Sequence, residues 1–186
     1  MSWLESNFPE PINLLGQRLE SLTLGHCMIL ERLKNPFFVS GTATVDHLFE
    51  CVYVCCQPCK DSWNSFFDEK FPEKIKVWRK KIGKHDFEKS MKVFEEYKEK
   101  STLFPDVGGG VDDVKRKLGT PYLLQLKLSL QSKLFYSEEE ALNKPISVAV
   151  WEVIGLLEMQ GEAKILNDTE REILNIHKEM LEKEEK

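Results

Sequence analysis

The stretch that most constrains the fold is residues 45–57, VDHLFECVYVCCQ. Its apolar residues recur at helical spacing, and the positions between them are almost all apolar as well. A helix that is hydrophobic nearly all round has to be buried. We therefore expect a central helix from Val45 to about Gln57, N-capped by Thr42 or Thr44 and ended by Pro58.

Apolar residues recur at helical spacing through most of the rest of the chain as well. Thr23 or Ser21 caps a predicted helix that runs to about Leu33, residues 14–20 can begin a short helix, and Ser137 with Glu140 matches a capping box. Further helices are predicted within 61–67, 72–83, 86–100, 122–135, 145–161 and 169–184. No hairpin signal or sustained two-residue alternation is present. The prediction is an all-α, compact multi-helix domain of about seven helices.

Residues 101–113, STLFPDVGGGVDD, break this pattern with a proline and three consecutive glycines. Such a backbone is flexible, so we expect a Gly-rich loop near residues 105–112. It does not resemble a phosphate-binding loop, because no strand precedes it and no Gly-Lys-Ser/Thr follows it. Residues 1–186 are predicted to form a single helical domain, and a subdivision into 14–100 and 114–186 around this loop stays open.

Charge and hydropathy exclude several classes of partner. The 186 residues carry a formal net charge of −5, whereas a nucleic-acid-binding protein needs a basic face. The basic cluster at residues 74–84 is better explained as a solvated helix face. No secretory signal pattern and no apolar run of membrane-spanning length occurs, so a cytoplasmic protein with no membrane partner is expected.

The five cysteines pose the question of a metal site. Cys51, Cys55 and Cys59 follow His47 at four-residue intervals, and Cys56 with Cys59 forms a Cys-x-x-Cys pair. Four successive helical turns spread such ligands over roughly 18 Å, which is too far for one ion. Close packing of small cysteines in the helix is the preferred interpretation. The metal candidates that remain are Cys27, Cys51, Cys55, Cys56 and Cys59.

The titratable residues form no catalytic pattern. No nucleophile elbow, triad or metalloprotease spacing is present. A thioredoxin-like thiolate would have to lie at a helix N-terminus, whereas Cys56 and Cys59 are both predicted to lie at a helix C-terminus. The carboxylates at 112–113 and 138–140 are explained as caps and solvated faces. We expect a protein that is not an enzyme and has no cofactor.

Two stretches resemble phage-encoded proteins grouped as tail assembly chaperones. The first is residues 22–37, LTLGHCMILERLKNPF, with a Thr-Leu-Gly helix entry and an Asn-Pro break. The second is residues 119–170, where a small residue, a proline and an aromatic residue start a helix, and Ser-Glu-x-Glu-Ala-Leu precedes Pro145. This stretch continues into a Trp-containing helix that ends in Glu-x-x-Gly, and then into Asn-Asp-x-Glu. The cysteine-rich helix and the glycine triplet depart from the pattern.

The resemblance implies a small acidic helical protein of the infected host's cytosol. Such a protein binds the phage tape-measure protein, or another tail protein, and keeps it soluble while tail-tube subunits assemble around it. A virion or adaptor protein of the same helical class stays open, as does a cysteine-rich metal-binding protein, and so does association into a homo-oligomer.

A client surface of this kind would use apolar anchors at helical spacing. The residues expected to contribute are apolar side chains of the last third of the chain and the two tryptophans near the basic cluster: Trp63, Trp78, Leu126, Leu130, Trp151 and Leu157. The same spacing also fits an ordinary buried core.

Overall fold

The computed structural model describes residues 12–83, 85–105, 107, 120–167, 169, 170 and 172. Across this part of the chain the fold consists of eight helices and one small two-stranded sheet, so the all-α prediction is confirmed. The lead-in at residues 1–11, the glycine triplet and most of the last predicted helix, 169–184, lie outside the described residues.

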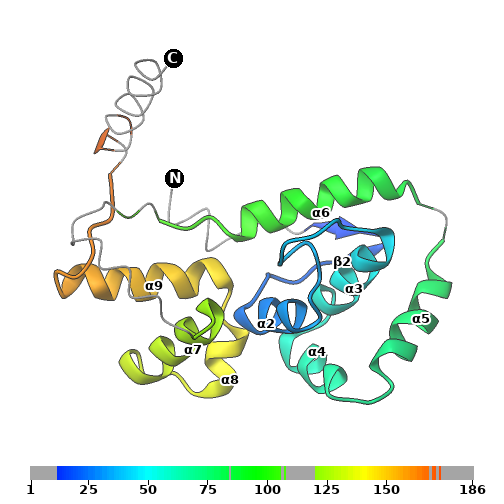
Figure 1. Cartoon of the computed structure of the whole chain (residues 1–186), viewed down its shortest axis with the longest axis horizontal. Coiled ribbons are helices and arrows are strands. Elements are labelled where there is room, and N and C mark those ends of the chain that lie inside the picture. Colours follow the sequence, from blue (N-terminus) through cyan, green and yellow to red (C-terminus); the bar gives the residue numbers. More distant parts are fainter. Residues whose placement is uncertain are drawn as a thin grey trace.

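The elements follow one another along the chain as short helices after an initial hairpin (Figure 1). Their bounds are β1 Asn13–Leu14, β2 Gln17–Arg18, α2 Leu24–Arg32, α3 Val45–Cys55, α4 Cys59–Phe66, α5 Phe71–Lys81, α6 Phe87–Ser101, α7 Tyr122–Lys133, α8 Glu138–Asn143 and α9 Ile146–Met159.

The helix α2 lies in the middle of the molecule and joins its two sides. It packs against α3 and α4 on one side and against α7, α8 and α9 on the other (Figure 1). Six of its residues are buried, and Leu24, Ile29 and Leu30 have no exposed surface. The central position therefore belongs to α2 as much as to α3, which was the helix expected there.

The start of α2 is tied to the α8–α9 junction by backbone hydrogen bonds. Leu24 N–H donates to the carbonyl of Lys144 at 2.9 Å, and Ile146 N–H donates to the carbonyl of Leu22 at 2.9 Å. Thr23 and Pro145 form an isolated antiparallel bridge between them. This clamp pairs groups that would otherwise be left without partners in the core.

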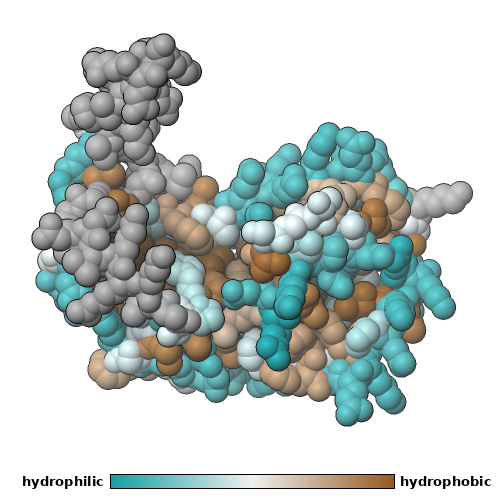
Figure 2. Space-filling view, in the orientation of Figure 1, coloured by the Kyte–Doolittle hydropathy of each residue, from teal (hydrophilic) through white to brown (hydrophobic). Residues whose placement is uncertain are grey.

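The helix α3 is buried as its sequence predicts. Leu48, Cys51, Val52, Val54 and Cys55 have no exposed surface. The rings of Phe49 and Tyr53 meet that of Trp78 edge-on, at centroid distances of 6.1 Å and 5.5 Å, and so dock α5 onto α3. Arg79 of the basic cluster also faces α3, where it lies 4.7 Å from the centroid of the Phe49 ring and pairs with Asp46. In the space-filling view, hydrophilic residues alternate with apolar ones on the right, where α5 and α6 lie (Figure 2).

The expected helix at residues 14–20 is wrong, because β1 and β2 pair there as an antiparallel hairpin. Its turn residues Leu15 and Gly16 have φ values of 52° and 73°, the combination of two positive φ angles found in tight type I′ turns. Leu15 is only 5% exposed, so core packing holds a leucine where glycine or asparagine is usual.

Helix ends follow the chemistry of their sequence. Asp86 and Ser137 cap α6 and α8 by accepting the third amide of each helix, and Ser137 with Glu140 completes the predicted capping box. Gly161, with φ 75°, ends α9, and Glu162 N–H donates back to Leu157 at 2.8 Å. The described residues contain no helix long and apolar enough to cross a membrane.

Candidate protein-binding groove

An apolar groove opens between α2, α4 and the start of α7. Its volume is about 450 Å³. The groove is lined by Met28, Ile29, Glu31, Arg32, Lys34, Trp63, Phe66, Phe67, Pro121, Leu123 and Leu124. Eight of these eleven side chains are apolar, so the feature suits an apolar occupant better than a polar substrate.

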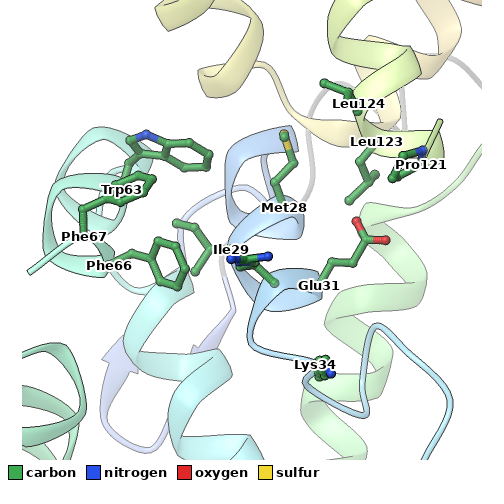
Figure 3. A pocket seen from close by; sticks show the side chains of 11 residues that line it. Met28, Ile29, Glu31, Lys34, Trp63, Phe66, Phe67, Pro121, Leu123 and Leu124 are labelled. Carbon is green, nitrogen blue, oxygen red and sulfur yellow. The ribbon is translucent and has the colours of Figure 1, made fainter. Parts of the chain in front are cut away.

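Three elements supply its walls and floor (Figure 3). Trp63, Phe66 and Phe67 of α4 form one wall, and Pro121, Leu123 and Leu124 face them from the start of α7. Met28 and Ile29 of α2 lie between the two walls. Ile29 is fully buried and belongs to the floor, whereas Phe67 is 68% exposed and stands at the rim.

Charged side chains mark one end of the groove, where α2 stops. Arg32 and Lys34 are exposed, and neither forms an ion pair with a described residue. Lys34 has φ 55°, and the next amide, that of Asn35, donates to Leu30 at 3.0 Å, so the helix ends in a Schellman motif with a lysine where glycine is usual.

Two smaller hollows adjoin the groove. One, of about 290 Å³, lies between α4 and α8 and shares Trp63 with it. The other, of about 380 Å³, lies between α2, α6 and α7 and shares Glu31 and Leu123. The three hollows are linked through these shared side chains. The linked surface crosses α2 between α4 on one side and α7 and α8 on the other.

The wall formed by α4 is fixed by close packing at its first turn. An added Cβ on Gly25 would lie 2.3 Å from Cys59 Sγ, so only glycine allows α4 to approach α2 this closely. Cys59 donates to the carbonyl of Leu142 at 3.4 Å, and Ser62 donates to that of Val54 at 2.7 Å. These contacts set the position of Trp63, one residue further along α4.

The candidate contact residues separate into three groups. Trp63 lines the groove and its neighbouring hollow. Trp78, Trp151 and Leu157 are half-buried and lie elsewhere: Trp78 packs on α3, and the Trp151 indole N–H donates to Leu103 at 3.2 Å.

Leu126 and Leu130, which were predicted to contribute to a client surface, are core residues. Their exposed fractions are 4% and 0%, because they face inward where α7 packs against α2, α8 and α9. An incoming segment cannot contact them without opening the core. The leucines that reach the groove are Leu123 and Leu124, which lie on the first turn of the same helix.

The five cysteines are free thiols. The helix C-terminus predicted for Cys59 is wrong, because Cys59 is the first residue of α4. Cys27, Cys51, Cys55 and Cys59 are nevertheless buried, and burial raises the pKa of each of them, which disfavours the thiolate that binds metals. Cys56 is half-buried, and burial raises its pKa to about 11. No three His, Cys, Asp or Glu side chains converge as a metal site within the described ranges.

His26 is a buried polar residue whose role sequence reasoning missed. It has no exposed surface, and burial lowers its pKa to about 4 despite the hydrogen bond that it makes to Gln57. Nδ1 accepts the backbone N–H of Thr23 at 3.4 Å, so the ring hydrogen lies on Nε2, which donates to the Gln57 carbonyl at 3.1 Å. The neutral ring thus caps α2 and fastens it to the end of α3.

A second polar cluster connects α7, α8 and α9. Lys144 Nζ lies 2.9 Å from the Tyr136 hydroxyl and 3.1 Å from Glu152 Oε1. Burial opposes the charge on Lys144, but the hydrogen bonds to Tyr136 and Glu152 outweigh it and raise the pKa. These groups do not line the groove, and their mutual pairing is a structural tie.

The sequence gives only a weak indication of the groove. Phe66 and Phe67 follow Trp63 closely, which indicates an aromatic cluster but not whether it faces the core or the solvent. No protein-family model, curated protein or solved structure matches the chain.

Proposed function

We propose that the protein is a non-enzymatic phage tail assembly chaperone, which binds apolar helical segments of the tape-measure protein in the host cytosol. The observation that carries this proposal is the groove between α2, α4 and α7, which exposes Met28, Trp63 and Phe67 around about 450 Å³ of space. A solvent-facing groove lined by three aromatic side chains and one methionine suits binding to the apolar face of an amphipathic helix.

The size of the groove supports a helix as the client. A cavity of about 150 Å³ holds one benzene ring, so the groove has room for about three large apolar side chains. Anchors of that number and kind occur on one face of a helix at positions i, i+3 or i+4, and i+7. Binding would remove these side chains from water on both partners.

The sequence resemblance supports the tape-measure protein as the client. Both resembling stretches line the groove, since Met28 and Ile29 belong to residues 22–37, and Pro121, Leu123 and Leu124 belong to residues 119–170. Trp63, Phe66 and Phe67 come from outside these stretches. The proposed client surface is thus built partly from the segments that resemble tail assembly chaperones.

The test is co-expression of the full chain with the tape-measure protein of its own genome, followed by native mass spectrometry under reducing conditions. A stoichiometric complex is the expected result. The variant Leu124→Glu puts a carboxylate into the groove and should lose the complex, whereas Met159→Ser, at an 80% exposed side chain on α9, should keep it. A complex that survives Leu124→Glu would place the client elsewhere, and no complex with the wild-type chain would reject the proposal.

Leu124 is chosen because the substitution is mild for the fold. It is half-buried and occupies the third position of α7, where a glutamate is favoured by the free amides of the first turn. Circular dichroism of the variant should therefore match that of the wild type. Finding the protein in finished phage particles would instead favour a virion or adaptor component.

A further inference from the structure

Phe135 is displayed to solvent at the end of α7. Its side chain is 87% exposed, the highest value among the large exposed hydrophobic residues of the described chain. Its backbone has φ 59°, in the left-handed region that glycine prefers at helix ends. The isolated chain thus holds a bulky apolar residue in an unfavourable backbone conformation without burying its ring.

We propose that Phe135 of one copy docks into the groove of a second copy of this chain. The groove offers the aromatic and aliphatic surface that an exposed phenylalanine lacks in its own copy, and its volume of about 450 Å³ exceeds the space that one ring needs. Burial of the ring in the complex would offset the cost of its backbone conformation.

Charge complementarity favours a second copy as the occupant. The segment that follows Phe135 carries Glu138, Glu139 and Glu140, against a single preceding lysine, Lys133. The groove ends at the exposed cations of Arg32 and Lys34, which outnumber the one carboxylate in its lining, that of Glu31. A ring inserted into the groove therefore brings a predominantly acidic segment toward a basic rim.

The existing ion pairs of this acidic segment do not oppose the contact. Glu138 pairs with Lys127 and Glu139 with Lys60, and both glutamates are 64% exposed. The Lys60–Glu139 pair is exposed on both sides and holds its partners weakly, so Glu139 can exchange its partner for a cation of another copy, whereas Lys127, whose side chain is 15% exposed, keeps Glu138. Glu140 caps its own helix and keeps its hydrogen bonds to Ser137.

The contact joins two different surfaces of the chain, which permits a decisive mixing experiment. The variant Phe135→Ser lacks the ring and keeps the groove, and Leu124→Glu lacks a usable groove and keeps the ring. Each variant alone should stay monomeric, because no copy then offers both halves of the contact. An equimolar mixture should form heterodimers, because one variant supplies the ring and the other the groove.

Analytical ultracentrifugation of the full-length proteins under reducing conditions measures this. Wild-type chain and the control Met159→Ser should associate as concentration rises, and Phe135→Ser should weaken association about tenfold or more, as expected for losing one buried aromatic ring. At concentrations where the wild type is largely dimeric and a tenfold weaker association leaves a chain monomeric, each single variant is expected to be monomeric. A wild type that stays monomeric at all concentrations, or a mixture of the two variants that stays monomeric, overturns the proposal.

The outcome is separable from that of the chaperone proposal. Phe135→Ser leaves the groove intact, so it should still bind the tape-measure protein in the co-expression test. Loss of self-association together with retained client binding supports both proposals. Client binding by a chain that never self-associates rejects only the role of Phe135.

Discussion

The contact between Gly25 and Cys59 makes a sharp prediction about stability. In the variant Gly25→Ala the new Cβ would lie 2.3 Å from Cys59 Sγ and 3.1 Å from the Leu142 carbonyl oxygen. Non-bonded heavy atoms pack favourably at about 3.5–4.0 Å, so the methyl group overlaps the sulfur by more than an ångström. Both residues are buried, and the neighbouring helices have to shift to relieve the overlap.

Overpacking of this kind costs about 1–3 kcal/mol in the free energy of unfolding. A matched control is Gly155→Ala, in the interior of α9, where an added Cβ meets nothing within 4 Å. That substitution should instead stabilise the protein by about 0.5–1 kcal/mol, because alanine is the better helix former. The same chemical change should therefore have opposite signs at the two sites.

Urea unfolding under reducing conditions, followed by circular dichroism, measures both effects. A second step identifies the cause: in a Cys59→Ala background the sulfur is gone, and Gly25→Ala should cost at least about 1 kcal/mol less than in the wild type. If Gly25→Ala proves neutral, or costs as much without the sulfur as with it, the close approach of α4 to α2 is not what requires glycine.

Two further predictions concern titratable groups. The pKa of His26 is about 4 in the folded protein, against 6.5 for an ordinary histidine in the unfolded chain. Between these two pH values the unfolded chain binds a proton that the folded protein does not bind. The free energy of unfolding should therefore fall by about 2–3 kcal/mol between pH values above 6.5 and pH 4.5. Urea unfolding at several pH values in this range measures the change in the free energy of unfolding. The variant His26→Gln should show a weaker pH dependence there. A variant with the same pH dependence as the wild type would contradict a buried neutral ring. Among the five thiols, only Cys56 should react with a disulfide reagent in the native protein, and it should react slowly because its pKa is about 11. All five thiols should react in denaturant. Rapid reaction of several thiols in the native protein would mean that the cysteines of α3 are not buried.

Much of the helical architecture could be predicted because its signals are local. Thr23, Asp86 and Ser137 accept the free amides of the helices that follow them, and each occupies a position that the sequence alone marks as a cap. The buried helix α3 was equally clear, since few positions in it are polar. These features depend on neighbours three or four residues away.

The hairpin at residues 13–18 could not be predicted because its cause is distant. The turn Leu15-Gly16 lacks the Asn-Gly or Asp-Gly signature, and Leu15 accepts a positive φ only because its side chain is buried in the core. Helical spacing also could not separate Leu124 from Leu126, since which leucine faces the groove is decided by where α2 and α4 pack against α7.

The clamp between residues 22–24 and 144–146 sets an order of events during synthesis. At about 5–20 residues per second, roughly 6 to 24 seconds separate the emergence of Leu24 from that of Lys144. Before α7 begins to emerge at Tyr122, the face of α2 that receives α7, α8 and α9 has no covering helix, although α3 and α4 are already available. The nascent chain therefore leaves this apolar face of α2 open to solvent until the last third of the sequence is made.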